Sequence, residues 1–233
     1  MPTPYISSTQ PLRLSEKIAG LIYLPLHIFV LPIFMGIFSQ VSPGTLTDIQ
    51  REAAYFLCGV IFVIVFFRDF LRRGFDVFMD NKLRSLMSIT STYFINIILT
   101  YGSLSVAMIF FGDFQIPEEL NPALMSKSGI LVLAGLGIFA ASLVDEVIFR
   151  GVVFGVLRSK NRVLAYVVSI LLFTVYHTWQ IWVIMPDMSV LIYTMQFIPL
   201  GYTLVLCYER SGSIWAPVFS QMIMNALAFS SYL

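Results

Sequence analysis

The feature that most constrains this chain is a series of apolar runs, each about as long as a helix that crosses a membrane. Because a hydrocarbon core about 30 Å thick needs roughly 20 apolar residues per helix, such runs predict transmembrane helices. The 233 residues are 58% hydrophobic and only 12% charged, so polar residues are too few to cover a water-soluble globule. The runs that we predict as helices are 18–39, 49–67, 92–112, 128–149, 163–184, 190–208 and 214–231.

The runs are separated by turn-forming and charged stretches, of which the longest extends from Arg68 to Arg84. The predicted fold class is therefore all-α, a polytopic membrane helical bundle of about seven transmembrane helices, in a single integral membrane domain over residues 1–233. The first sixteen residues are polar and lack the layout of a cleaved signal peptide. We find no internal repeat, which argues mildly against a transporter built from two matching halves.

The distribution of basic residues predicts a cytoplasmic N-terminus, because cytoplasmic loops are enriched in Lys and Arg. In that orientation only Arg51 and Lys127 fall on the outer side, together with Asp113, Glu118, Glu119 and Asp187. The basic residues on the inner side are Arg13, Lys17, Arg68, Arg72, Arg73, Lys82, Arg84, Arg158, Lys160, Arg162 and Arg210. A net charge of +1, spread over helix ends, is no indication of nucleic-acid binding.

Ionisable side chains deep in predicted membrane helices are the strongest functional candidates, because an unpaired charge is costly there. Asp145 and Glu146 lie in an otherwise apolar run that ends at Arg158, which places Asp145 about 20 Å from that basic end. Glu146 and Arg150 have i,i+4 spacing and are expected to pair on one helix face, while Asp145 points about 100° away. The sequence therefore predicts one acid that is neutralised structurally and a neighbour that stays available for chemistry.

Two further predicted helices carry polar side chains at a comparable depth. His177 lies about 22 Å from Arg162, where an imidazole can donate to a developing oxyanion or exchange a proton. Gln221 and Asn225 form an i,i+4 pair of amides, which can hold a water or donate hydrogen bonds to a carbonyl oxygen. Three helices thus bring acid, imidazole and amides to a similar depth, which indicates a functional site, although each segment alone is more typical of packing between helices.

Three other residues in the predicted helices are expected to be structural. His27 lies between Pro25 and Pro32, and we interpret it as a histidine that bonds to a backbone carbonyl freed by a proline. Cys58 and Cys207 lie within predicted spans, where apolar packing is expected in place of a disulfide framework.

The order and spacing of the candidate residues resemble the CPBP family of intramembrane proteases, which includes type II CAAX prenyl endopeptidases and bacteriocin-processing or immunity proteins. The family pattern runs E-E-x-x-x-R, then F-x-x-x-H, then H-x-x-x-N or D, on three membrane helices. The matching stretches begin at Asp145, Phe173 and Gln221, and the family-like core covers about residues 128–231. The resemblance implies an intramembrane endopeptidase of a bacterial cytoplasmic membrane, which cuts a peptide bond near the cytoplasmic leaflet in CAAX-type or leader-peptide processing.

Two departures from the pattern fall on residues to which the family assigns chemical roles. Asp145 replaces the glutamate that is taken to activate the hydrolytic water, and withdraws the carboxylate by about 1.5 Å. Gln221 replaces a histidine, and an amide can donate to an oxyanion but cannot shuttle a proton. The resemblance permits zinc, but His177 with carboxylates alone falls short of the usual three good protein ligands, so we expect a site without metal or cofactor.

The resemblance implies a metal-free hydrolysis in which each candidate has a role, and alternatives stay open. The roles are general base for Asp145, polarisation of the scissile carbonyl for His177 and Gln221, water binding for Asn225, and helix geometry for Glu146 with Arg150. The alternatives are a catalytically silent relative that acts as an immunity or membrane binding partner, and a small transporter or proton-coupled channel. Expected partners are membrane lipid and a peptide or membrane-protein substrate. The oligomeric state is not fixed, although Gly151-x-x-x-Gly155 permits close helix packing.

Overall fold

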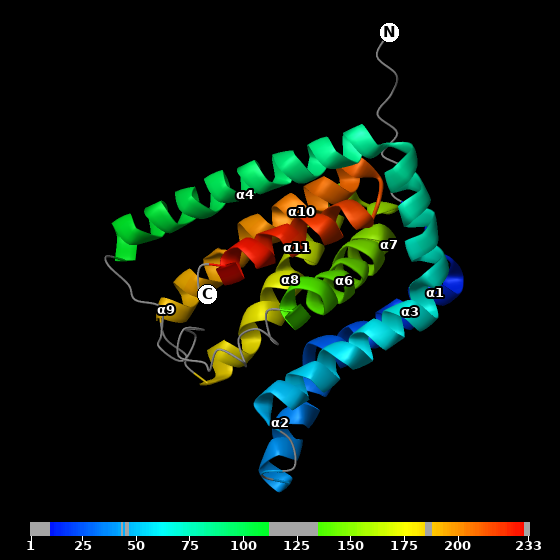
Figure 1. Ribbon diagram of the computed structural model, residues 1–233. Helices are drawn as coiled ribbons and strands as arrows, with labels where there is room; N and C mark the ends of the chain where they lie inside the picture. Colours follow the sequence, from blue (N-terminus) through cyan, green and yellow to red (C-terminus); the bar gives the residue numbers. More distant parts are fainter. Residues whose placement is uncertain (1–9, 43, 45–46, 112–134, 185–187, 231–233) are drawn as a thin grey trace.

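The computed structural model describes residues 10–42, 44, 47–111, 135–184 and 188–230, and within these ranges the regular structure is entirely helical. The helices form seven consecutive segments, which confirms the predicted all-α membrane bundle (Figure 1). The beginning of the predicted run 128–149 and the outer-side residues Asp113, Glu118, Glu119, Lys127 and Asp187 lie outside the described residues. In chain order the elements are α1 (Leu14–Pro25), η1 (Leu26–Val30), α2 (Leu31–Val41), α3 (Asp48–Asp80), α4 (Lys82–Phe111), η4 (Leu136–Ala141), α6 (Ser142–Asp145), η5 (Glu146–Phe154), α7 (Gly155–Arg158), α8 (Arg162–Ile184), α9 (Met188–Met195), α10 (Phe197–Ser211) and α11 (Trp215–Ser230), where η marks a π-helix.

Five of the seven described segments are long and apolar enough to cross a bilayer. They are Leu14–Val41, Gln50–Asp80, Lys82–Phe110, Arg162–Ile184 and Val190–Ser211. The two others are the continuous helix from η4 to α7, which carries the predicted acidic motif, and α11, which has 16 residues. The predicted number of about seven helices is roughly consistent with these segments. The helix from η4 to α7 carries three charged residues in its apolar part, and the described part of α11 is shorter than a typical span.

Two predicted helix boundaries are wrong. The stretch from Arg68 to Arg84, expected as a connection, is helical except around Asn81, so α3 reaches 33 residues. A helix satisfies its own backbone hydrogen bonds and its long basic side chains extend into water, so it continues beyond the apolar part of the membrane. The run 190–208 is divided at Gln196, and Pro199 in the first turn of α10 has no N–H to continue the ladder into α9.

The packed core of the bundle surrounds η5, all nine residues of which are buried. Phe67 and Phe70 of α3 pack against this helix. The predicted close packing at Gly151 is used within the chain, since a Cβ there would lie 3.1 Å from the Phe70 ring. At Gly20 of α1 a Cβ would lie 2.4 Å from the Val152 side chain, so the glycine allows α1 to lie directly against η5. The N-terminal helix is therefore held close to the acidic motif.

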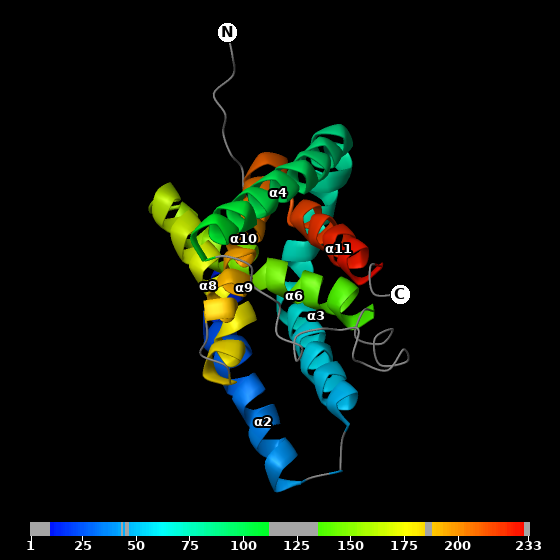
Figure 2. The ribbon, with the colours of Figure 1, turned by 90° about the vertical axis from the view of Figure 1, so that its left-hand side faces the viewer.

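One end of the bundle gathers the basic residues and is tied by polar contacts. Glu209 of α10 accepts from Arg158 at 2.8 Å, and from Arg162 and Tyr166 at 2.7 Å each. Arg73 of α3 pairs with Glu16 of α1 at 3.1 Å. At the opposite end α2 has no buried residue and extends, together with the beginning of α3, beyond the C-terminal helices (Figures 1 and 2). That this basic end faces the cytoplasm stays a prediction.

Candidate functional site

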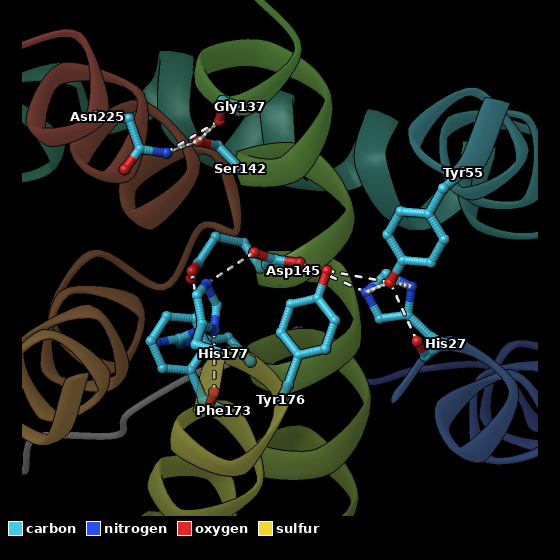
Figure 3. Close-up of polar contacts among 11 residues, drawn as sticks. His27, Tyr55, Gly137, Ser142, Asp145, Phe173, Tyr176, His177 and Asn225 are labelled. Carbon is cyan, nitrogen blue, oxygen red and sulfur yellow. Dashed lines mark hydrogen bonds and ion pairs between the residues drawn. The ribbon is translucent and has the colours of Figure 1, made fainter. Parts of the chain in front are cut away.

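Asp145 lies between two imidazoles at the centre of the bundle. It is the last residue of α6, where the helix passes into the π-turns of η5, and it is 1% exposed. Its Oδ2 is 3.7 Å from His177 Nε2 of α8, and its Oδ1 is 3.5 Å from His27 Nε2 of η1 (Figure 3). Asp145 and His177, predicted from separate motifs, are thus brought together, and a second histidine joins them from the first helix. Two of these elements are π-helical, a geometry that is frequent at functional sites.

The imidazole of His177 is oriented by its own helix. Its Nδ1 is 3.0 Å from the Phe173 carbonyl oxygen, one turn earlier in α8. A carbonyl oxygen only accepts, so Nδ1 carries the hydrogen and Nε2 is left to face Asp145. The ring packs between Phe173 and Phe197, with centroids 4.3 and 4.8 Å away. His177 therefore presents one chosen nitrogen, which accepts in the neutral ring and donates in the imidazolium.

His27 is held by two tyrosines. The Tyr55 hydroxyl lies 3.0 Å from His27 Nδ1, 3.0 Å from the His27 carbonyl oxygen and 3.1 Å from the Tyr176 hydroxyl. The imidazole also stacks on both rings, with centroids 5.3 Å from Tyr55 and 4.7 Å from Tyr176. The nitrogens face Tyr55 and Asp145, not a freed backbone carbonyl, so the sequence interpretation of His27 was wrong about its bonding partner.

A cavity of about 270 Å³ lies beside Asp145 and His177. It far exceeds the roughly 10–15 Å³ that one water requires, so it has room for a water and part of an extended peptide. Its walls combine aromatic and apolar side chains with a few polar groups, as in many ligand sites. The lining residues are Pro32, Met35, Arg51, Glu52, Tyr55, Phe56, Ala141, Asp145, Tyr176, His177 and Gln180.

Glu146 and Arg150 form the predicted i,i+4 ion pair, and neither lines the cavity. Arg150 Nη1 is 2.9 Å from Glu146 Oε1, and both side chains are fully buried. Arg150 Nη2 also donates to the Gly201 carbonyl of α10 at 3.4 Å, and the guanidinium lies 4.1 Å from the centre of the Phe173 ring. The pair therefore joins η5 to α8 and α10 and supports the helix that carries Asp145.

The amides of α11 do not meet Asp145. Asn225 Nδ2 donates to the Gly137 carbonyl at 2.9 Å and contacts Ser142 Oγ at 3.2 Å, so it ties α11 to η4 and α6 (Figure 3). Gln221 is 2% exposed, and neither amide lines the cavity. The expected chamber shared by all four polar residues is therefore not present. Asn225 binds the acidic helix at Gly137 and Ser142, which precede Asp145 by eight and three residues, whereas His27 of η1 and His177 of α8 lie beside Asp145 itself.

Sequence reasoning interpreted His27 as structural and did not single out Tyr55 or Tyr176, although all three lie near Asp145. For His27 the signal was an ionisable residue deep in a membrane helix, which is a functional candidate by default. The tyrosines carry no such signal, because tyrosine is common in apolar runs and neither belongs to the recognised pattern.

The donors around Asp145 were also tested for their fit to a metal ion. Among the residues that the structure describes, no three His, Cys, Asp or Glu side chains are grouped to hold one. The donor set therefore does not fit the zinc that the resemblance permits, and no step below is derived through a metal.

Comparison with known proteins locates the recognisable part of the chain. Residues 127–227 match the family model described as Type II CAAX prenyl endopeptidase Rce1-like. The Bacillus subtilis (strain 168) protein named "Putative membrane peptidase YdiL" is 32% identical over 85 residues, which make up 36% of this chain and 30% of that protein. The chain thus matches less than a third of that relative's length. No solved structure matches the chain. The family match contains Asp145 and His177 but neither His27 nor Tyr55.

Proposed function

We propose that the chain is a CPBP-type intramembrane endopeptidase that cuts a peptide bond in the cavity beside Asp145, as its match to the Type II CAAX prenyl endopeptidase Rce1-like family model over residues 127–227 supports. The observation that carries the proposal is the placement of a buried carboxylate and an oriented imidazole at the wall of one cavity inside the bundle. An acid, an imidazole and room for a water are the groups that peptide hydrolysis needs.

In the proposed reaction Asp145 takes a proton from a water as the water oxygen attacks the carbonyl carbon of the peptide. The imidazolium form of His177 donates from Nε2 to the carbonyl oxygen, on which negative charge develops. The C–N bond then breaks, and the proton held by Asp145 passes to the departing amine nitrogen. One water is consumed, and a carboxyl and an amino terminus are released.

The remaining predicted site residues take supporting roles in this proposal. Glu146 with Arg150 fixes the helix behind Asp145, as the family resemblance implies. Asn225 fixes α11 against η4 and α6, so we assign it to positioning the acidic helix in place of holding the water. Gln221 does not line the cavity, so we assign it no contact with the scissile carbonyl.

The position of the cavity bears on the side from which a substrate enters. Arg51 and Glu52 line it from the beginning of α3, whereas the basic residues gather at the other end of that helix. We propose a bacterial cytoplasmic membrane with the basic ends in the cytoplasm. Under that orientation the cavity extends toward the outer leaflet, which conflicts with the expectation of cleavage near the cytoplasmic leaflet. The test replaces Cys58 and Cys207, introduces Glu52→Cys, and labels the new thiol with a membrane-impermeant reagent from each side of the membrane. Labelling from outside supports a cavity that extends toward the outer leaflet, and labelling from the cytoplasm supports cleavage near the cytoplasmic leaflet.

The test of the proposed function is peptide cleavage by the full chain in proteoliposomes. The probes are a quenched peptide with a farnesylated cysteine three residues from its C-terminus, the same peptide without the farnesyl group, and a quenched leader-type peptide. We expect Asp145→Asn to lower cleavage at least about a hundredfold, because it removes the general base while keeping the side-chain shape. Asp69→Asn, the same change at an exposed acid of α3, is the matched control and should cleave normally.

Two results would contradict the proposal. One is wild-type protein that cleaves none of the peptides from either side of the membrane, and the other is an Asp145→Asn variant that cleaves as fast as wild type. The first result would favour a catalytically silent relative that binds a membrane partner. The observation that favours this second candidate is that neither α11 amide lines the cavity, which leaves the cavity without the family's third motif.

A further inference from the structure

His27 contributes a second imidazole to Asp145 from outside the family-like part of the chain. Its side chain is 1% exposed, and its Nε2 is 3.5 Å from Asp145 Oδ1, an oxygen that makes no hydrogen bond among the described residues. In free enzymes catalytic hydrogen bonds are often long and shorten when substrate binds. The family pattern expects a second histidine at position 221, where this chain has glutamine, so His27 is the second imidazole that actually lies beside the acid.

The packing of α1 and η1 fixes where the His27 ring lies. Gly20 brings α1 directly against η5, and Ile28 next to His27 belongs to an apolar cluster with Phe149 and Phe173. The ring itself stacks with Tyr23, Tyr55 and Tyr176, with centroids 5.4, 5.3 and 4.7 Å away. A buried ring packed against three aromatic neighbours has little room to turn, and its Nε2 lies nearest one carboxylate oxygen of Asp145 while the other oxygen faces His177.

The single hydroxyl hydrogen of Tyr55 allows His27 to match both charge states of Asp145. When Tyr55 donates to His27 Nδ1, the neutral ring carries its hydrogen on Nε2 and can donate to an ionised Asp145. When Tyr55 donates to the His27 carbonyl, Nδ1 keeps the hydrogen and Nε2 can accept from a protonated Asp145. The two arrangements are different tautomers of His27, and the first is the one in which the ring donates to the ionised Asp145 that accepts a proton from water.

We infer that His27 is a positioning residue for Asp145, and that it holds the carboxylate with Tyr55 as its hydrogen-bond partner. The inference rests on the proposed function. His27 does not line the cavity, so it acts through Asp145 and not on the substrate. It also explains how the shorter aspartate works in place of glutamate, because an imidazole from the N-terminal helix orients the withdrawn carboxylate.

The competing interpretation is that His27 only fills the aromatic stack, and two substitutions separate the alternatives. His27→Phe keeps the ring and the stack but removes both nitrogens. His27→Gln loses the stack but keeps an amide nitrogen near the position of Nε2. If the ring matters only for packing, activity should follow stability and the Phe variant should be the better of the two. If the nitrogen positions Asp145, the Gln variant should be more active although it is less stable.

The experiment measures kcat and KM with the same farnesylated and unmodified peptides, alongside thermal unfolding of each variant in detergent. We expect His27→Phe to lower kcat about a hundredfold with KM within threefold of wild type, since a misplacement of about 1 Å can cost that much. His27→Gln should recover about tenfold of this loss, and Tyr55→Phe should lower kcat less than His27→Phe. Val30→Ala, at a half-exposed position in the same π-turn, should leave kcat unchanged.

The outcomes distinguish this inference from the proposed function. Wild-type cleavage that is lost in Asp145→Asn but retained in His27→Phe overturns the inference and leaves the proposed function standing. Activity that follows the stability order of the His27 variants overturns it as well. Wild-type protein that cleaves no peptide overturns the proposed function, and the inference with it.

Discussion

The N-terminal helices α1 to α4 and the C-terminal helices from η4 to α11 share one bundle but have different surroundings. In the span Lys82–Phe110 only 6% of the most apolar window is buried, against 44% in Val190–Ser211. All nine residues of η5 are buried, whereas α2 has none. The most buried segments thus belong to the C-terminal half and the least buried to the N-terminal half, whereas the spans Gln50–Asp80 and Arg162–Ile184, at 28% and 22%, are similar.

The part of the chain that matches the family model does not contain all the residues that surround Asp145. The family match ends at residue 127 on its N-terminal side, yet His27 and Tyr55 from the N-terminal half complete the surroundings of Asp145. A few inward-facing residues of a mostly lipid-exposed helix are enough to build one wall of the site. The two halves should accordingly differ in stability effects but cooperate in activity.

The largest expected difference between the halves concerns ion pairs. Arg150→Met should destabilise the protein by about 3–5 kcal/mol, because it leaves the fully buried Glu146 carboxylate without its partner. Arg13→Gln breaks the exposed pair with Asp69 and should cost no more than about 1 kcal/mol. Thermal and denaturant unfolding of the two variants in the same detergent measures the contrast. Equal losses would show that the two halves do not differ as their burial indicates.

The sequence predicted the bundle well because lipid imposes a simple requirement on helix length and apolarity. It also predicted the Glu146 and Arg150 pair, since both partners lie on one helix and their spacing determines their contact. The juxtaposition of Asp145 with His177 followed from equal depth and from the family pattern. These features depend on one helix or on a recognised motif, and such information is present in the chain itself.

The remaining features depend on how helices pack, which spacing along one helix does not determine. Gln221 and Asn225 were predicted to lie at a depth similar to that of Asp145, but spacing along one helix does not determine its contacts, and Asn225 bonds to Gly137 and Ser142. The contact between His27 and Asp145 joins residues 118 positions apart and requires the close approach at Gly20. The helical continuation of α3 through Arg68 was also missed, because a charged stretch marks a membrane boundary without ending a helix.

An intermediate effect is expected at the contact between α11 and η4, inside the C-terminal half. Asn225→Leu should destabilise the protein by about 0.5–1.5 kcal/mol, since it removes the amide that donates to the part-buried Gly137 carbonyl, to which Ser142 Oγ still donates at 3.4 Å. Ser142→Ala removes that weaker hydrogen bond and the contact with Asn225, but keeps the stronger bond from Asn225 to Gly137, so it is the control. Once corrected for the folded fraction, the kcat of Asn225→Leu should fall far less than that of Asp145→Asn. A loss as large as that of Asp145→Asn would assign Asn225 to the chemistry and restore the role that the resemblance implies.

The smallest effect on cleavage is expected at position 221, where the family pattern suggests a large one. Gln221→His restores the histidine of the family pattern, yet cleavage should stay within about threefold of wild type. Gln221 lies outside the cavity, and the second imidazole beside Asp145 is already supplied by His27 from the other half of the molecule. Cleavage assays of Gln221→His in the wild-type and His27→Phe backgrounds check this directly. A gain of more than about tenfold in either background would mean that position 221 reaches the reacting groups, and that the C-terminal half can build the site without the N-terminal helix.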